Sequence, residues 1–327
     1  MIKKRILVCG ASGFIGQNVF EVLSKQDDYD VMGTYRNPDH RRRFKPEDKQ
    51  RSILRLVDLT SREEVMDAVH RADVVIQCAA VTSGARDIVT RPYIHVTDNV
   101  IMNSLLLEAA CKRRTPHFIF LSCTVMYPMN LDHAVKEYEV DRGKIHEQYQ
   151  SGARMKLFVE ELCEDYARWG NTKFTIVRHS NIYGPHDKFD LERSHMVGAT
   201  IHKVMQAQDG AAISVWGDGS EGRDLLYVSD LVEFIELAIE KQQTQYEIMN
   251  VGAGASVPVR DVVKTIVEES GKDLRIEYDL SKPTIPVTVS LDTTKAREQF
   301  GWQPKVDLRE GIRRTIEWYR GNILIHG

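Results

Sequence analysis

Long apolar runs are absent from this sequence, since no stretch approaches the ~20 consecutive apolar residues that a membrane span needs. An excess of charge of one sign is absent too: 44 Lys and Arg stand against 47 Asp and Glu, for a formal net charge of −3. Without a long basic face, nucleic acid is not expected as a partner. We therefore expect a soluble, cytoplasmic protein that binds neither a membrane nor a nucleic acid.

Cysteine is scarce, and its pattern argues against two kinds of stabilising site. The cysteines are odd in number and scattered along the chain, without the close spacing of metal ligands: Cys9, Cys78, Cys111, Cys123 and Cys163. This pattern predicts no disulfide framework and no zinc or other metal site, and it favours a reducing compartment.

Short apolar runs alternate with amphipathic helical patterns through the first half of the 327-residue chain. The strand-like runs are residues 5–9, 30–34, 53–57, 74–78, 118–121 and 174–178. The helical patterns are residues 15–25, 62–71, 98–113 and 152–169. Such alternation implies crossover connections, so the sequence predicts an α/β fold with a doubly wound parallel sheet.

The alternation loosens after about residue 182. A glycine-rich turn at residues 217–220 and a loop with Pro283 and Pro286 suggest a smaller C-terminal α/β lobe. Residues 230–240 and 245–252 look like a helix and a strand that return to the main sheet. We predict a dinucleotide-binding Rossmann domain of residues 1–182 plus about 228–255, and a substrate-binding lobe of about 183–227 and 256–327.

A glycine-rich segment, Gly10-Ala11-Ser12-Gly13-Phe14-Ile15-Gly16, connects the first expected strand to the first expected helix. In this context the glycines let the backbone approach a pyrophosphate closely, and the helix N-terminus offers unpaired N–H groups and a favourable dipole. We therefore predict that this loop, with Gly10, Ser12, Gly13, Phe14, Ile15 and Gly16 as contacts, holds the pyrophosphate of NAD or NADP.

The end of the second expected strand, Gly33-Thr34-Tyr35-Arg36-Asn37, lacks the carboxylate that usually holds the ribose 2′-hydroxyl of NAD. Arg36, with help from Arg41 or Arg42, is a candidate to pair with a 2′-phosphate through its forked donors. NADP is therefore favoured, with NAD possible; the alternative is that Arg36 only faces solvent. We expect at least part of the run His40-Arg41-Arg42-Arg43 to be a solvated loop.

The spacing Gly-x-x-Gly-x-x-Gly resembles the short-chain dehydrogenase/reductase family. Other matches resemble its extended branch, the NAD-dependent epimerases and dehydratases: Asp58-Leu59, Ala79-Ala80, Asn99, and the segments 300–304 and 308–311 with Trp318. The resemblance implies that Asp58 and Leu59 lie by the adenine, and that the backbone at Ala79 and Ala80 passes the ribose and pyrophosphate. It also implies further cofactor contacts from His179, Asn181, Ile182 and Lys156.

Residues 181–189 and Ser194-His195-Met196-Val197 resemble GDP-L-fucose synthases, which act on a GDP-linked 4-keto sugar. The resemblance implies that His195 is an acid/base group in epimerisation. It also implies a set of substrate contacts: Asn181, Val197, Lys203, Trp216 and Arg223. A lysine and an arginine that converge on a diphosphate act as charge-assisted donors, whereas Trp216 either stacks on the substrate or belongs to the core. The implied partner is a nucleotide sugar, with a GDP-sugar favoured.

The expected catalytic residues depart from the family pattern. Hydride transfer in this family depends on a Ser/Thr, a Tyr and a Lys, of which the last two are four residues apart on one helical face. The lysine lowers the pKa of the tyrosine, which then exchanges a proton near neutral pH. Family spacing places the lysine at Lys156, but Gly152 stands at the tyrosine position.

Other family positions differ as well. The Ser/Thr position is Cys123, and Ser122 or Thr124 would replace it only after a local shift of the backbone. The position of the epimerisation cysteine is Val125, which cannot transfer protons. The basic residues of the substrate-phosphate loop fall on Thr288 and Val289.

Three interpretations fit these departures. In the first, the enzyme uses other residues, with Tyr149 reaching in from the preceding turn or His195 exchanging the proton. In the second, Gly152 is an introduced substitution that disables a working enzyme. In the third, the protein is a natural binding or regulatory relative. In all three, Lys156 can hydrogen-bond the nicotinamide ribose.

We predict an NAD(P)-dependent nucleotide-sugar oxidoreductase acting at C4 of a GDP-linked hexose or heptose. Because Val125 replaces the thiol, a 4-dehydrogenase, a 4-ketoreductase or a single-centre epimerase fits better than a double epimerase. The family usually pairs two helices between protomers, here residues 98–113 and 152–169. Both have apolar faces wider than one sheet contact needs, which predicts a homodimer.

Overall fold

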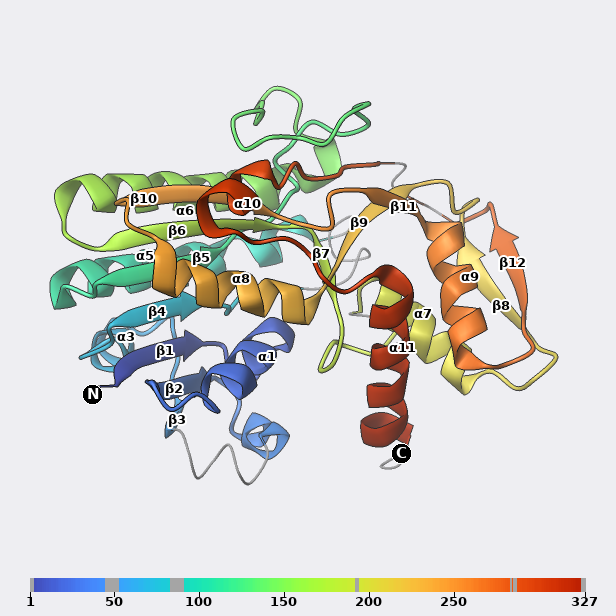
Figure 1. The fold of residues 1–327 in the computed structure, drawn as a ribbon, viewed down its shortest axis with the longest axis horizontal. Helices are drawn as coiled ribbons and strands as arrows, with labels where there is room; N and C mark the ends of the chain where they lie inside the picture. Colours follow the sequence, from blue (N-terminus) through green and yellow to red (C-terminus); the bar gives the residue numbers. More distant parts are fainter. Residues whose placement is uncertain are drawn as a thin grey trace.

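A computed structural model describes residues 3–44, 53–82, 91–191, 194–282, 284 and 287–324. Its centre is a seven-stranded sheet in the order β3-β2-β1-β4-β5-β6-β10, in which every neighbouring pair is parallel (Figure 1). The strands are β1 (Lys4–Cys9), β2 (Tyr29–Tyr35), β3 (Ile53–Leu56), β4 (Val74–Gln77), β5 (His117–Leu121), β6 (Lys173–His179) and β10 (Tyr246–Val251). This arrangement confirms the predicted doubly wound parallel sheet.

Helices cover both faces of this sheet. On one face lie α1 (Phe14–Leu23), α8 (Val228–Lys241) and α10 (Thr294–Phe300). On the other lie α3 (Arg62–Ala68), α5 (Thr97–Arg113) and α6 (Gln150–Trp169). Because a strand alternates its side chains, Ile6 and Val8 join the first core and Leu7 and Cys9 the second. Burial on both sides explains the continuous apolar runs that made these strands visible in the sequence.

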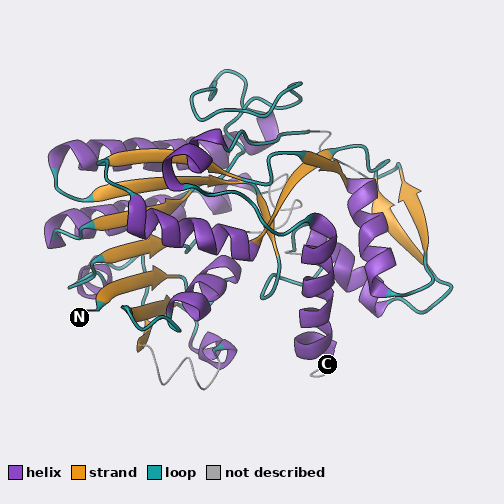
Figure 2. Cartoon of the chain, in the orientation of Figure 1, coloured by secondary structure: helices purple, strands orange, loops and turns teal. Residues whose placement is uncertain are grey.

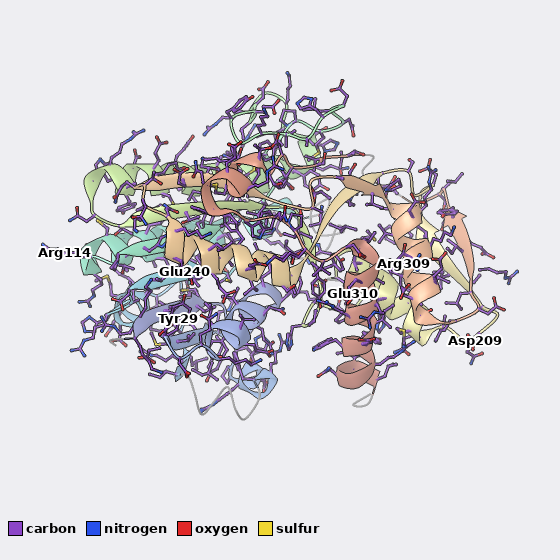
Figure 3. All side chains as sticks on the ribbon, in the orientation of Figure 1. Tyr29, Arg114, Asp209, Glu240, Arg309 and Glu310 are labelled. Atoms are coloured by element: carbon purple, nitrogen blue, oxygen red, sulfur yellow. The ribbon has the colours of Figure 1, made fainter. Side chains whose placement is uncertain are left out.

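Further elements lie beyond the carboxyl ends of the parallel strands, whose arrowheads point toward them in Figure 2. One sheet has the order β11 (Ser256–Pro258), β9 (Gly222–Tyr227) and β7 (Asn181–Tyr183), and a second pairs β12 (Arg275–Asp279) with β8 (Ala212–Trp216). Helices α7 (Met196–Gln206), α9 (Val259–Ser270) and α11 (Leu308–Tyr319) share one core. At its border Arg309, labelled in Figure 3, pairs with Glu268 and Glu269 of α9.

The returning helix and strand expected at residues 230–240 and 245–252 are α8 and β10, and β10 pairs with β6 in register from Tyr246 to Val251. The predicted loop residues Pro283 and Pro286 lie outside the described residues. The remaining short helical turns are η1 (Pro38–Arg43), η2 (Pro92–His95), η3 (Glu147–Tyr149) and η4 (Arg320–Leu324). No helix in the described part of the chain is long and apolar enough to cross a bilayer.

The expectation that at least part of residues 40–43 is solvated is confirmed for Arg41 and Arg43, which are exposed, but the run is helical rather than a loop. Residues 38–43 form the 3-10 helix η1, which begins where the Asn37 side chain accepts a hydrogen bond from the Asp39 N–H. The next residue, Phe44, is 2% exposed and contacts the rings of Phe20 and Tyr35. The burial of this ring holds η1 against the first βα unit. The Arg41 side chain is exposed, and that of Arg42 lies outside the described part.

Candidate functional site

The glycine loop between β1 and α1 has no room for side chains at two positions. Gly10 has a φ of +72°, and a Cβ there would lie 2.7 Å from the Cα of Ala79. A Cβ on Gly16 would lie 2.2 Å from the Gly10 carbonyl oxygen. Gly13, the N-cap of α1, has no side chain that accepts hydrogen bonds from the first helical turn. The loop therefore fits a pyrophosphate, which binds the N–H groups of a helix N-terminus.

Polar side chains fix the backbone that follows β4, where Ala79 and Ala80 were predicted to pass the cofactor. The Ala79 N–H donates to Gln77 Oε1 at 3.1 Å, and the Gln77 amide donates to Asn103 Oδ1 at 3.0 Å. Asn99 accepts from the Val81 N–H at 2.9 Å and donates to its carbonyl at 3.1 Å. These bonds hold the segment after β4 against α5, and the same segment places Ala79 beside Gly10 of the glycine loop.

The predicted adenine end contains Asp58, Leu59 and Arg36. The Asp58 carboxylate accepts from both the N–H and the hydroxyl of Thr60, and these bonds hold its pKa below the usual range. Leu59 is 7% exposed and belongs to the core, so its side chain supports this edge from below. Arg36 follows β2 directly and is 66% exposed, with Asp98 at 3.8 Å. Its guanidinium is thus available to a ligand beyond β2.

Two further residues, which sequence reasoning did not single out, contact the glycine loop from η1. His40 Nδ1 lies 3.2 Å from the Ser12 hydroxyl, and the Arg43 guanidinium donates to the Ser12 carbonyl at 3.1 Å. Gln17 of α1 donates to the Arg43 carbonyl at 2.9 Å. The sequence held a signal for this element: Asn37 and Pro38, just before the basic run, are typical of the start of a helical turn.

Lys156 lies at the carboxyl end of β5, as its predicted role requires. Its ammonium donates to the Leu121 carbonyl at 2.7 Å and lies 4.6 Å from the centre of the Phe120 ring. Burial lowers the pKa of Lys156, and the nearby Cys123, Glu160 and Cys78 act in the opposite direction. The predicted Cys123 is therefore beside the lysine, but burial raises the pKa of its thiol.

Two histidines, His179 and His195, lie within electrostatic reach of one another, and His179 is also within reach of Lys156. His179, at the end of β6, places Nδ1 2.8 Å from the Ser180 carbonyl, and burial, followed by Lys156 and His195, lowers its pKa to about 4. His195 precedes α7, and partial desolvation together with the charge of Lys188 lowers its pKa. Both imidazoles are neutral near pH 7, so His195 can accept a proton there.

Gly152 lies one helical turn before Lys156 on α6, at the position where the family has its tyrosine. Apart from its chain neighbours and the backbone of its own helix, no heavy atom of the described structure lies within 4 Å of the position that its Cβ would occupy. A larger side chain there would therefore meet open space rather than packed atoms. The site therefore lacks the phenol hydroxyl of the family tyrosine, but the helical backbone at position 152 is the same kind that would carry it.

Tyr149, the predicted substitute, is directed toward the substrate side. It ends η3, its ring centre is 5.8 Å from that of His146, and the positive charge of Arg223 opposes the rise that burial causes in its pKa. The groups that influence the pKa of Lys156 are different ones, namely Cys123, Glu160 and Cys78. Tyr149 is thus brought together with Arg223 more directly than with Lys156.

The hydroxyls next to Cys123 are both turned inward. Ser122 is 1% exposed and donates to Glu160 Oε1 at 2.5 Å, so its hydroxyl belongs to a buried polar network. Thr124 is 9% exposed, and its carbonyl accepts from the Tyr127 N–H at 3.0 Å. A change of backbone would be needed to bring either hydroxyl to the Cys123 position.

The predicted substrate residues separate into side chains that reach the surface and side chains that pack. Trp216 is 48% exposed at the end of β8, which excludes the core alternative for this residue. Lys203 on α7 donates to the Ser214 carbonyl at 3.2 Å, and burial lowers its pKa. Val197, by contrast, is 3% exposed inside the α7–α9–α11 core. A substrate contact at Val197 would therefore come from its backbone.

Arg223 and Asn181 connect the substrate side to the main sheet. Arg223 donates to the carbonyls of Gly222 at 2.9 Å and Val287 at 2.7 Å, and the Asn181 amide donates to the Asp224 carbonyl at 3.1 Å. Ile182, a predicted cofactor contact, is 7% exposed in the core of the α1 face. The Thr288 hydroxyl, at a family phosphate-binding position, accepts from the Gly222 N–H at 3.0 Å. Nowhere in the described part do three or more potential metal ligands gather.

The architecture defines the class of protein. A doubly wound parallel sheet with a glycine-rich β1–α1 loop beside its switch point, between β1 and β4, is the dinucleotide-binding Rossmann fold. The sequence profile of the NAD dependent epimerase/dehydratase family matches residues 6–252. The chain therefore belongs to the NAD dependent epimerase/dehydratase family, and it is an NAD(P)-dependent enzyme of that type, as the glycine spacing predicted.

Individual relatives match over nearly the whole chain. GDP-L-colitose synthase of Yersinia pseudotuberculosis is 28% identical and covers 96% of this chain and 97% of its own length. GDP-L-fucose synthase of Escherichia coli (strain K12) is 27% identical, with 98% of both chains covered. The solved structure of UDP-glucose 4-epimerase with UDP-glucose from Thermotoga maritima superposes with a TM-score of 0.84 at 27% identity, covering 98% of this chain and 99% of that one. The predicted resemblance to GDP-L-fucose synthases is confirmed.

Proposed function

We propose that the protein is an NADP(H)-preferring oxidoreductase that acts at C4 of a GDP-linked sugar. The observation that carries the proposal is the placement of Lys156 and His179 at the carboxyl ends of β5 and β6, where the Lys156 ammonium donates to the Leu121 carbonyl at 2.7 Å. The relatives named GDP-L-colitose synthase and GDP-L-fucose synthase support a GDP-linked substrate. The open position beside Gly152 distinguishes this chain from the family pattern.

The chain's own residues divide the work of holding the cofactor. The glycine loop receives the pyrophosphate, Arg36 faces the adenosine ribose beyond β2, and Lys156 hydrogen-bonds the nicotinamide ribose. When bound, the nicotinamide supplies a hydride acceptor or donor for the sugar carbon. Lys156 is anchored to the Leu121 carbonyl, so the protein fixes its ammonium before a ligand arrives.

The substrate side supplies positive charge and one proton-transfer group. Lys203 and Arg223 are the donors for the nucleotide diphosphate, and the charge of Arg223 also acts on the pKa of Tyr149. The exposed indole of Trp216 offers a surface on which the substrate stacks. His195 is neutral near pH 7 and accepts the proton from the sugar hydroxyl, or returns it as an imidazolium. Without a tyrosine at position 152 of α6, this transfer is expected to be slow.

Val125 leads to a prediction about epimerisation. Incubation of a GDP-linked 4-keto sugar with the protein in heavy water should not give rapid deuterium uptake at both C3 and C5, because the valine side chain cannot take part in the second proton transfer. Proton NMR of the recovered sugar measures both positions. Rapid exchange at both positions would show that the protein is a double epimerase after all.

Gly152 also supports a second candidate, a protein that binds cofactor and nucleotide sugar without turning them over. The open position leaves the site one proton-transfer group short of the family set. Turnover of a nucleotide sugar at ordinary enzymatic rates, roughly 1 per second or above, rejects this candidate. Tight binding of both ligands with no measurable reduction or oxidation over hours supports it.

We also propose that the protein is a homodimer built on α5 and α6. These helices expose large apolar side chains on their outer surface: Ile101 at 40%, Phe158 at 43% and Trp169 at 70%. The double substitution Ile101→Asp and Phe158→Asp is expected to produce monomers, because it places two carboxylates in the dimer contact. Sedimentation velocity measures the mass. The control Leu280→Asp, at a position 75% exposed outside these helices, should stay dimeric; a wild-type monomer would refute the proposal.

A further inference from the structure

We infer that His40 forms part of the recognition site for the 2′-phosphate of NADP(H), and that its protonation makes NADP(H) binding, but not NAD(H) binding, depend on pH. This inference rests on the proposed preference for NADP(H). It concerns a residue that the resemblance to the family did not single out, and it follows from how η1 sits against the glycine loop.

Hydrogen bonds between η1 and the glycine loop fix the position of His40. Its Nδ1 lies 3.2 Å from the hydroxyl of Ser12, the second residue after Gly10 in the predicted pyrophosphate loop. Arg43 donates to the Ser12 carbonyl at 3.1 Å, and Gln17 donates back to the Arg43 carbonyl at 2.9 Å. These bonds fasten η1 to the loop and to α1, so His40 stands at the start of the cofactor path.

The same place is where a 2′-phosphate would arrive. In Rossmann folds the adenosine ribose hydroxyls lie at the end of the second strand, which here is Tyr35, with Arg36 next. The His40 imidazole and the Arg43 guanidinium both contact Ser12, at 3.2 and 3.1 Å, and Arg36 follows the end of β2. Burial and the charges of Arg43 and Arg36 lower the pKa of His40. A basic cluster of two arginines and one histidine therefore borders the ribose position. A dianion between them gains charge-assisted hydrogen bonds from each.

The charged groups around His40 come from several elements. Asp39, its neighbour in η1, is the carboxylate that raises its pKa, and it acts against Arg43 and Arg36. The glycine loop contributes the neutral Ser12, and α1 contributes Gln17, whose amide also contacts Glu21. Asp98 on α5 lies 3.8 Å from Arg36 and partly neutralises it. The positive charges outweigh the negative ones nearest the ring.

The sign of the pH dependence follows from the two states of His40. In the protein without cofactor the pKa of His40 is lowered from 6.5, so the ring is mostly neutral near pH 7. A bound phosphate dianion favours the charged ring and raises that pKa, so binding takes up a proton. The affinity for NADP(H) must then fall as the pH rises between the two pKa values. The phosphate itself loses its second proton near pH 6, about the lower limit of a clean measurement.

The experiment measures the dissociation constants of NADPH and NADH by isothermal titration calorimetry from about pH 6.5 to about pH 8.5. Repeating each titration in buffers of different ionisation heat counts the protons taken up. For the wild type, the NADPH dissociation constant is expected to rise about tenfold across this range, with up to one proton taken up. That of NADH should change less than about twofold, because NADH lacks the 2′-phosphate.

Two variants make the result specific. His40→Gln keeps a side chain that can hydrogen-bond Ser12 but cannot become charged, and it should remove both the slope and the proton uptake seen with NADPH. His70→Gln, a change at an exposed histidine just after α3, should keep the wild-type profile. Groups near the nicotinamide, such as His179, affect both cofactors alike and cancel in the NADPH-to-NADH ratio. Thermal unfolding of each variant verifies that it is folded.

The outcomes test the role of His40 separately from the preference for NADP(H). A wild-type preference for NADPH that is flat with pH, or a slope unchanged in His40→Gln, overturns the role of His40 and leaves the cofactor preference standing. Equal or tighter binding of NADH at every pH overturns the preference itself, and the inference with it. A slope that is present in the wild type and in His70→Gln, and lost only in His40→Gln, supports both.

Discussion

Replacement of Gly152 with tyrosine is expected to raise the turnover number of the protein by about 10²- to 10⁴-fold, the usual contribution of a well-placed general acid or base. The position is four residues before Lys156 on α6, so the new phenol projects from the same helical face as the ammonium. Apart from its chain neighbours and the backbone of its own helix, no heavy atom of the described structure lies within 4 Å of the Cβ that it adds. Tyrosine is also a better helix former than glycine in this setting, so the fold should tolerate the change.

The measurement is the steady-state reduction or oxidation of a GDP-linked sugar with NADPH or NADP, followed as a function of pH. Gly152→Phe is the matched control, because it adds the same ring without the hydroxyl and should not raise the turnover number. In Gly152→Tyr the pH profile should also gain a group with a pKa below that of an ordinary tyrosine, because the nearby lysine charge stabilises the phenolate.

Two results would contradict this reading of the site. Equal turnover in Gly152→Tyr and Gly152→Phe would show that the phenol does not reach the reacting group. A wild type that is already fast, and is silenced by His195→Gln without loss of cofactor binding, would show that His195 has fully replaced the tyrosine. The same loss in Tyr149→Phe would assign that role to Tyr149, although its position beside Arg223 points to the substrate instead.

The sequence predicted the central sheet well because its inner strands, such as β4 and β5, are buried along their whole length and the crossover helices are periodic. Strand β10 illustrates this, since the return of residues 245–252 to the main sheet was expected from the sequence, and the structure places the strand at the edge beside β6. The glycine loop was equally visible, because steric crowding at Gly10 and Gly16 restricts both positions to one residue type. Local patterns of this kind determine fold class and cofactor type.

The less visible features all depend on contacts between distant segments. Nothing in the basic run at residues 40–43 shows that Phe44 is buried against Phe20 and carries η1 onto the glycine loop. Periodicity likewise left Trp216 undecided between core and surface, because strand β8 alternates and either face was possible until its partner β12 was known. The catalytic departure at Gly152 was found in the sequence, but the open space beside it was not.

The second large effect is expected from the buried ion pair between α6 and β6. Arg178 Nη2 donates to Glu160 Oε2 at 2.6 Å, and both side chains are at most 4% exposed. Arg178 also donates to the Tyr127 hydroxyl at 2.9 Å and to the Glu137 carbonyl at 2.7 Å. Ser122 donates to the other oxygen of Glu160. Ser122 after β5 and Arg178 near the end of β6 are thus both bonded to the buried carboxylate of Glu160.

Arg178→Met is expected to lower the free energy of unfolding by about 3–5 kcal/mol, because Glu160 is left as a buried charge without its partner. Urea denaturation followed by circular dichroism measures this loss. Arg142→Met is a matched control, because Arg142 pairs with Glu161, the neighbour of Glu160 on α6. These two side chains are 63% and 56% exposed, so the loss should stay under about 1 kcal/mol. A loss of similar size in both variants would mean that burial does not set the cost.

The double variant Arg178→Met with Glu160→Leu separates the cost of the lone carboxylate from the value of the pair. If the uncompensated charge causes most of the loss, removing Glu160 as well should restore about half of it or more, although Ser122 and Tyr127 then lose a partner each. No recovery would mean that the polar network itself stabilises the fold. Arg178 immediately precedes His179, so both variants should also change the affinity for NADPH. If the double variant recovers stability but not NADPH binding, the ion pair positions the site as well as supporting the core.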